Sequence, residues 1–382
     1  MFWDSRFDMT ATTLYGLEDV LKGELRELGA SNIKGENRAV TFQGDLRLLY
    51  RANLEIRTAL KILVPIHSFS AKNDDALYSA VREVDWRKYM SVTETLAVDS
   101  VVHSEHFTHS QYVALRVKDA IVDQFRKRKN RRPSVDLDNP SLRINIYISH
   151  DECVVSLDSS GDSLHRRGYR KDGDMAPLNE VLAAGMIQLT GWQGDLHFVD
   201  PMCGSGTILC EAAMIARNIA PGIHREDYGF MHWPNFDYDL WEEVIGEAQR
   251  GERECSYQIV GSDISGQALD SARKNITRAG LDEHIRLAKS AFEQREPSVD
   301  SGIVVMNPPY GERMAKEDII GFYRQIGDQL KQNYPGFDAW ILSGNREALK
   351  HVGLRPSENI TLYNGPIECR FQKFEIYRGS RR

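Results

Sequence analysis

The alternation of short apolar segments with helical segments after residue 190 constrains the fold of this chain most strongly. The apolar segments cover residues 196–199, 258–261, 285–287, 302–306 and 339–342, and the helical segments cover residues 207–216, 266–279 and 319–332. Apolar strands separated by helices are typical of a parallel sheet with helices on both faces. The last two apolar runs, 359–363 and 370–377, have no helix between them and predict an antiparallel closing hairpin. We therefore expect a doubly wound α/β domain in the C-terminal half.

Residues 1–160 show a different pattern, in which a few helices lie among short strands. One predicted helix ends at Gly29, and another covers residues 112–127. The predicted strands cover residues 39–42, 142–149 and 154–158. Residues 161–174 are rich in Gly, Asp and Arg, which predicts a linker or surface loop before a helix at 177–189. The chain thus reads as an α+β half followed by an α/β half.

Composition excludes several protein classes. The 382 residues are 41% hydrophobic and 27% charged, which is ordinary for a globular protein and excludes wholesale disorder, collagen and disulfide scaffolds. No apolar run approaches the length of a membrane-spanning helix, and the first residues lack the pattern of a signal peptide. The five cysteines form no C-x-x-C pair, so we expect a cytoplasmic protein without disulfides or a zinc site.

A dense basic run stands out against the net charge of −7. Residues 126–132 contain six basic side chains in seven positions. A solvated helix end would explain them, because cations suit the C-terminal end of a helix dipole. We favour a phosphate-contacting patch, because nucleic-acid binding depends on local rather than total charge. The RNA-binding residues predicted here are Arg126, Lys127, Arg128, Lys129, Arg131 and Arg132.

A glycine-containing loop, residues 200–207, follows the first strand of the α/β half and opens directly into a helix. This is where a doubly wound sheet binds a nucleotide-like ligand, and Gly204 and Gly206 would let the backbone approach it closely. The loop lacks the Gly-Lys-Ser/Thr of an ATPase, and Leu209 occupies the third glycine position of the dinucleotide fingerprint. Asp263 ends the next strand, where it could bind ribose hydroxyls or simply cap the following helix.

The most specific motif is Asn307-Pro308-Pro309-Tyr310, directly after the strand at 302–306. The two prolines prevent continuation as strand or helix, so the segment projects from the edge of the sheet. The Asn307 side-chain oxygen and the Pro308 carbonyl can both accept hydrogen bonds from a planar –NH2 group, and Tyr310 can lie against a base. This arrangement suits methylation of an exocyclic amine, because that poor nucleophile must be held and aimed.

Together these motifs resemble the class I S-adenosylmethionine-dependent methyltransferases that carry Asn-Pro-Pro-Tyr. The N-terminal half is similar to a ferredoxin-like region, residues 1–55, followed by a THUMP RNA-binding domain, residues 56–160. The junction at 163–170 resembles that of large-subunit ribosomal RNA guanine-N2 methyltransferases. The resemblance implies a Rossmann-like, seven-stranded methyltransferase domain over residues 161–382. It also implies that the catalytic residues are Asn307, Pro308, Pro309 and Tyr310, and that the cofactor contacts are Pro177, Asp200, Pro201, Cys203, Gly204, Ser205, Gly206, Thr207, Asp263, Ile264, Ser290, Ala291 and Asn307.

The resulting hypothesis is transfer of a methyl group from S-adenosylmethionine to N2 of a guanine, with 23S ribosomal RNA or a ribosome assembly intermediate as partner and no membrane or metal. Methylation of guanine in tRNA, of adenine N6 in DNA or RNA, or of a protein glutamine uses similar motifs and stays open. His103, His106 and His109 lie in a polar stretch with no recognisable metal-ligand spacing. We interpret Cys203 as a small packing residue rather than a nucleophile. The aromatic-rich stretch 220–255 is either packing or a lid over the substrate.

Overall fold

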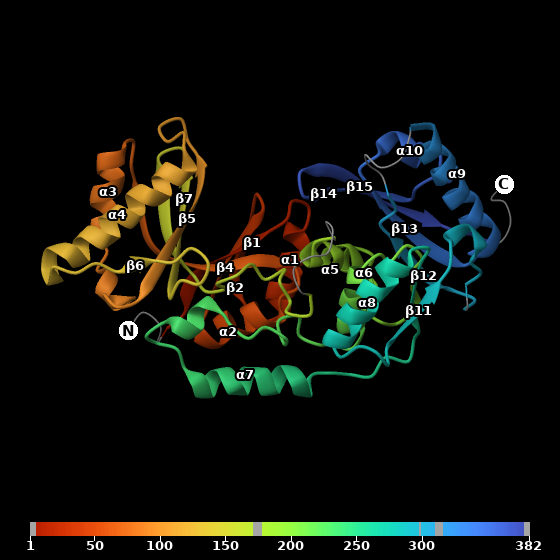
Figure 1. The fold of residues 1–382 in the computed structure, drawn as a ribbon, viewed down its shortest axis with the longest axis horizontal. Coiled ribbons are helices and arrows are strands. Elements are labelled where there is room, and N and C mark those ends of the chain that lie inside the picture. Colours follow the sequence, from red (N-terminus) through yellow and green to blue (C-terminus); the bar gives the residue numbers. More distant parts are fainter. Residues whose placement is uncertain (1–4, 171–177, 298, 310–315, 378–382) are drawn as a thin grey trace.

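The computed structural model describes residues 5–170, 178–297, 299–309 and 316–377. The two halves of the chain lie along the long axis of the molecule (Figure 1). Helices α3 (Asp74–Glu83) and α4 (Ser110–Lys129) lie at one end, and α9 (Lys316–Asn333) and α10 (Arg346–Lys350) at the other. In the described residues, no helix is both long enough and apolar enough to cross a membrane.

The N-terminal half is built on one eight-stranded sheet with the order β2-β3-β1-β4-β8-β7-β5-β6. Its strands are β1 (Phe7–Thr13), β2 (Ser31–Glu36), β3 (Ala39–Gly44), β4 (Ala59–Ser70), β5 (Thr95–His103), β6 (Ser134–Val135), β7 (Leu142–Ser149) and β8 (Glu152–Asp158). Besides α3 and α4, this half contains α1 (Glu18–Glu27) and α2 (Leu46–Glu55). The expected α+β class is confirmed.

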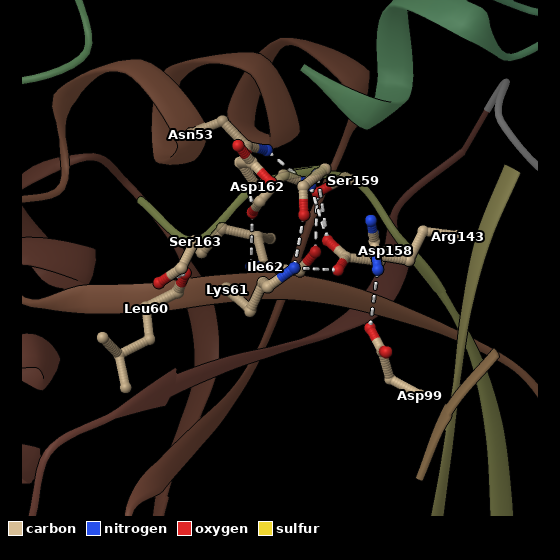
Figure 2. A network of polar contacts seen from close by, with 12 residues as sticks. Asn53, Leu60, Lys61, Ile62, Asp99, Arg143, Asp158, Ser159, Asp162 and Ser163 are labelled. Carbon is tan, nitrogen blue, oxygen red and sulfur yellow. Dashed lines mark hydrogen bonds and ion pairs between the residues drawn. The ribbon is translucent and has the colours of Figure 1, made fainter. Parts of the chain in front are cut away.

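Strand β4 joins the two parts of this sheet. Its first residues pair with β1, and residues from Leu63 to Ser70 pair with β8. A buried polar network holds β4 where its pairing changes from β1 to β8 (Figure 2). Lys61 Nζ lies 2.5 Å from the Asp158 carboxylate, and the Ser159 hydroxyl donates to the Ile62 carbonyl at 2.7 Å. The Asn53 side chain donates to Ser159 at 2.9 Å, so α2, β4 and the end of β8 are held together.

The C-terminal half contains the expected seven-stranded sheet, with the order β11-β10-β9-β12-β13-β15-β14. Its strands are β9 (Phe198–Asp200), β10 (Ile259–Asp263), β11 (Ile285–Lys289), β12 (Gly302–Met306), β13 (Phe337–Ser343), β14 (Glu358–Asn364) and β15 (Ile367–Glu375). The first five are parallel, and β14 and β15 form the antiparallel hairpin that the sequence predicts.

Helices cover both faces of this sheet, as β12 shows. Ile303 and Val305 pack into the cluster with α5 (Glu180–Leu189), α6 (Thr207–Ala216) and α8 (Gly266–Arg278), whereas Val304 and Met306 pack against α9 and α10. A strand buried on both faces must be apolar at every position, which explains why the run at 302–306 is continuous.

One segment differs from expectation, and for a second segment the structure supports the packing alternative. Of the predicted linker or surface loop at 161–174, residues up to 170 are described, and Leu164, Arg167 and Tyr169 are buried rather than on the surface. The stretch 220–255 contains a 3-10 turn, η3 (Gly229–His232), and helix α7 (Tyr238–Arg250). Most of its aromatic side chains pack in the core of the N-terminal half, where Phe230 stacks on Tyr50 at 4.5 Å between ring centroids, whereas Tyr238 is exposed.

Candidate active site at the carboxyl edge of the sheet

The carboxyl ends of β9, β10, β11 and β12 open onto a cavity of about 740 Å³, which we call the carboxyl-edge cavity. Its lining includes most residues that the sequence predicts for cofactor binding and catalysis. Those that line it are Asp200, Pro201, Cys203, Gly204, Ser205, Thr207, Asp263, Ile264, Ser290, Ala291, Asn307 and Pro309. Because neighbouring parallel strands end at one edge, four segments that are distant in sequence meet here.

The remaining predicted site residues have other positions. Gly206 and Pro308 are described but do not line the cavity, and Pro308, which follows Asn307 in sequence, is buried. Pro177 and Tyr310 lie outside the described residues. The basic run is at the end of α4, where Arg126, Lys127, Arg131 and Arg132 are exposed. The side chains of Arg128 and Lys129 are not among those described.

The glycine loop between β9 and α6 is shaped by two left-handed residues, Gly204 at φ +52° and Gly206 at φ +81°. A Cβ on Gly206 would lie 3.1 Å from the Ala272 Cβ of α8, so the tight approach of these helices also requires glycine. The loop therefore turns sharply enough to direct the first turn of α6, with its free backbone N–H groups, at the cavity.

Asp263 holds this loop in place. One carboxylate oxygen accepts the Gly204 N–H at 2.9 Å, and the other accepts the Ser265 N–H at 2.8 Å. The cap of α8 is Ser265, whose hydroxyl accepts the Ala268 N–H at 3.2 Å, so Asp263 is not the cap. Its position at the cavity wall remains available for a ligand.

Two polar atoms in the cavity lining are buried and have no hydrogen-bond partner among the described residues. They are Oδ2 of Asp200 and Oδ1 of Asn307. Buried acceptors usually have a donor, so this pair indicates that a ligand supplies one. Burial raises the pKa of Asp200 to about 8, with a further contribution from the nearby Asp263 carboxylate. A cationic group beside Asp200 would reverse that shift.

The charge of the lining is one-sided. Asp200, Asp263 and Glu293 contribute carboxyl groups, although burial favours the neutral form of Asp200 until a cation lies beside it, and no Lys, Arg or His lines the cavity in the described part of the chain. A dinucleotide or a nucleoside triphosphate would place its phosphates among these acids without a countercharge. A cationic ligand fits this lining better.

Cys203 is buried, and burial raises the pKa of its thiol well above the usual value. A catalytic thiol requires the opposite shift, so the interpretation as a packing residue holds. The described residues contain no group of three or more His, Cys, Asp or Glu side chains arranged to hold a metal ion.

Sequence reasoning missed several lining residues, among them Gln267, Ser271, Glu293 and Phe322. Gln267 and Ser271 are four residues apart on α8, so they share one face of the helix, and this spacing could have indicated them. Phe322 comes from α9 on the other side of the sheet, and no local pattern marks it.

Comparison with known proteins agrees with this architecture. Residues 167–373 match the family described as RMKL-like, methyltransferase domain, residues 71–158 match the THUMP domain, and residues 8–63 match the RlmL ferredoxin-like domain. The resemblance seen in the sequence is thereby confirmed.

Individual relatives cover nearly the whole chain. Ribosomal RNA large subunit methyltransferase K/L of Syntrophotalea carbinolica is 42% identical over 388 residues, which is 98% of this chain but 54% of that protein. The chain therefore spans about half the length of this relative. The protein slr0064 of Synechocystis sp. is 42% identical over 369 residues, 96% of each chain.

Among solved structures, SMU.472 in complex with SAH superimposes with a TM-score of 0.87 at 30% identity, covering 98% of this chain and 99% of that one. The match thus extends over both halves and includes their arrangement. The chain belongs to the RMKL-like methyltransferase family, with a THUMP domain and an RlmL-type ferredoxin-like domain preceding the methyltransferase domain.

Proposed function

We propose that this protein transfers a methyl group from S-adenosylmethionine to the exocyclic N2 of a guanine in RNA, with 23S ribosomal RNA as the substrate. The observation that carries the proposal is the buried Oδ1 of Asn307 in the carboxyl-edge cavity, which has no hydrogen-bond partner in the described part of the chain. The motif supplies acceptors, and an exocyclic amine supplies the donors that they lack. The name of the 42% identical K/L relative supports ribosomal RNA as the substrate class.

The cavity suits S-adenosylmethionine in shape and charge. This ligand carries an ammonium and a sulfonium, and the lining offers carboxylates with no competing cation. Asp263 would accept ribose hydroxyls, Ile264, Ser290 and Ala291 would border the adenine, and the loop at 203–207 would face the methionine end. When bound, the cofactor supplies an electrophilic methyl group.

The chain's own residues then position the amine. Asn307 Oδ1 and the Pro308 carbonyl would each accept one N–H of the target –NH2 group, which orients the nitrogen lone pair and stabilises the positive charge that develops on nitrogen. Pro308 is buried and Pro309 follows it, so this acceptor pair is held rigidly. Tyr310 is proposed to lie against a base that has been flipped from its stack.

RNA is proposed to be captured by residues 1–55 and 56–160, with the basic run on α4 contacting phosphates. In Figure 1, α4 lies at one end of the molecule, whereas α8 and α9, which contribute to the cavity lining, lie in the other half. A substrate that reaches both must therefore extend along the molecule, which favours a large structured RNA over a small molecule or a short peptide.

The test is mass spectrometry of methylated nucleosides after incubation with labelled S-adenosylmethionine. The substrates are 23S ribosomal RNA and tRNA, purified separately from cells that lack the gene. We expect labelled N2-methylguanosine in 23S ribosomal RNA. The same nucleoside in tRNA would keep the mechanism and change the substrate, whereas N6-methyladenosine would contradict the choice of base. Absence of label from both pools would direct the search to assembly intermediates and to protein glutamine.

A further inference from the structure

Four arginines donate hydrogen bonds to helix α6 in the described residues, and none of them lines the carboxyl-edge cavity. Arg253 donates to the carbonyl of the last helical residue, Ala216, at 2.8 Å, and the other three contact the helix along its length. Arg170 donates to the Thr207 hydroxyl at the first residue of the helix. Arg167 forms two bonds of 3.4 Å to the Glu211 carboxylate, one turn further on. Arg57, from the N-terminal half, donates to the carbonyls of Met214 at 3.3 Å and Ile219 at 2.7 Å, at the C-terminal end of the helix.

These contacts link the helix to the RNA-binding half through buried groups. The side chains of Arg167 and Glu211 are 1% and 0% exposed. Arg167 also donates to the Arg57 carbonyl at 2.5 Å, so the junction segment and the N-terminal half meet directly on α6. A charge this deeply buried is stable only with well-placed partners, and each partner here belongs to a different part of the chain.

A second contact fixes Arg57 itself. The Glu24 carboxylate of α1 accepts the backbone N–H groups of Arg57 at 2.8 Å and Thr58 at 3.0 Å. The same carboxylate accepts the side-chain amide of Gln188 at 3.0 Å, at the end of α5. Thus α1 holds both the arginine that caps α6 and the helix that packs beside α6.

Because α6 begins at the glycine loop, any shift of the helix moves that loop. We propose that Arg57 and Arg167 are positioning residues for the methyl donor: by fixing α6 they fix the loop at 203–207 at its N-terminal end. This inference rests on the proposed function, since it takes the loop to be the cofactor site. Met214 is seven residues beyond Thr207, about 10 Å along the helix axis, so Arg57 acts from a distance.

The consequence is that the RNA-binding half contributes to the affinity for the methyl donor without touching it. A loop displaced by a fraction of an ångström loses several hydrogen bonds to the ligand at once. In the variants Arg57→Lys and Arg167→Lys the charge remains, but the forked geometry that reaches two acceptors is lost. A lysine therefore tests geometry rather than charge.

The experiment measures the Kd for S-adenosylhomocysteine by calorimetry, together with Tm without ligand. We expect Kd to rise about tenfold in Arg167→Lys and about fivefold in Arg57→Lys. In the methylation assay, KM for the methyl donor should rise by similar factors, with kcat within about twofold of the wild type.

Arg225→Lys is the matched control. Its guanidinium donates to the carbonyls of Ser160, Asp162, Ser163, Arg166 and Asp227, and none of these acceptors in the described residues belongs to α6. This variant should lose comparable Tm but keep Kd within about twofold. Equal weakening in the control would reduce the effect to general destabilisation and overturn the proposal, as would an unchanged Kd in both test variants.

A milder variant covers the case in which Arg167→Lys does not fold. Glu24→Gln removes one of the carboxylate oxygens that hold Arg57 and Thr58, and it should raise Kd about threefold. An unchanged Kd in this variant would count against the proposal. Failure of the wild-type protein to bind S-adenosylhomocysteine would overturn the cofactor assignment as well, whereas normal wild-type binding with unaffected variants would overturn the positioning role alone.

Discussion

The carboxyl-edge cavity and the end of α4 have opposite electrostatic character. The cavity is lined by three carboxylates and no basic side chain in the described residues, whereas the end of α4 exposes Arg126, Lys127, Arg131 and Arg132. Neither follows from the net charge of −7. The difference shows that a small cationic ligand and a polyanion can use separate regions of one chain, each with its own charge. The two should therefore respond independently to mutation and salt.

The largest expected effect is on the rate of methyl transfer and not on ligand binding. Asn307→Ala removes the acceptor proposed to hold the target amine, and kcat should fall by about 10²–10³. Both binding steps should survive, with Kd for S-adenosylhomocysteine and for RNA within about threefold of the wild type. Single-turnover methylation and calorimetry make the comparison. A near-normal rate would refute the proposed site.

Asp263→Ala should weaken S-adenosylhomocysteine binding in the cavity without changing RNA binding at α4. The variant loses the proposed ribose contact and the acceptor that holds Gly204, so Kd for S-adenosylhomocysteine should rise about 50-fold, or roughly 2 kcal/mol. RNA affinity, measured by filter binding, should stay within about twofold. A parallel loss of RNA affinity would show that the two regions are not independent.

The reverse experiment changes the end of α4. The double variant Arg126→Gln/Lys127→Gln should lower RNA affinity about tenfold and make the slope of log K against log salt shallower by roughly one. S-adenosylhomocysteine binding should not change. The control is Arg346→Gln/Lys350→Gln on α10, an equal change of charge at exposed positions near the other end. Equal losses in the control would mean that total charge, not the patch, governs RNA binding.

The smallest effect concerns stability and pH. The pKa of Asp200 is raised from 3.8 to about 8 by burial, so the folded protein keeps a proton that the unfolded chain loses between these values. The contribution of Asp200 to stability therefore falls as pH rises from about 4 to 8. Asp200→Asn removes this penalty, and its Tm should exceed that of the wild type by about 4 °C at pH 8, with little difference at pH 5. Thermal melts without ligand at both values measure it, and a constant difference would exclude Asp200 as the cause.

The α/β half was predictable because each of its strands is a local signal. Residues 207–216 form the expected helix and residues 302–306 the expected strand, each with the same ends as predicted. The strand was easy to predict because a strand buried on both faces is apolar throughout. The ends of those strands also predicted that the polar side chains following them would lie together at the carboxyl-edge cavity. By contrast, Phe322 reaches the cavity through the packing of α9, which depends on tertiary contacts.

Other features had no sequence signal. Strand β4 contains Pro65, which normally indicates an edge strand, yet β4 is central, and its pairing with β8 shifts register between Pro65 and His67. Arg167 and Glu211 would be assigned to the surface by residue type, because charged side chains are rarely fully buried unless paired. Only the folded chain brings that pair together.

Strand β4 also constrains the order in which the protein can assemble during synthesis. Leu63 pairs with Asp158, so 95 positions separate partners that lie side by side in the sheet. The edge of β4 that faces β8 stays without its native partner until the ribosome has produced nearly all of the N-terminal half. Pairing at such long range is slow, and exposed strand edges promote aggregation. A nascent chain that pauses before residue 150 would therefore present an open β-strand edge, and this is where a ribosome-bound chaperone would be needed.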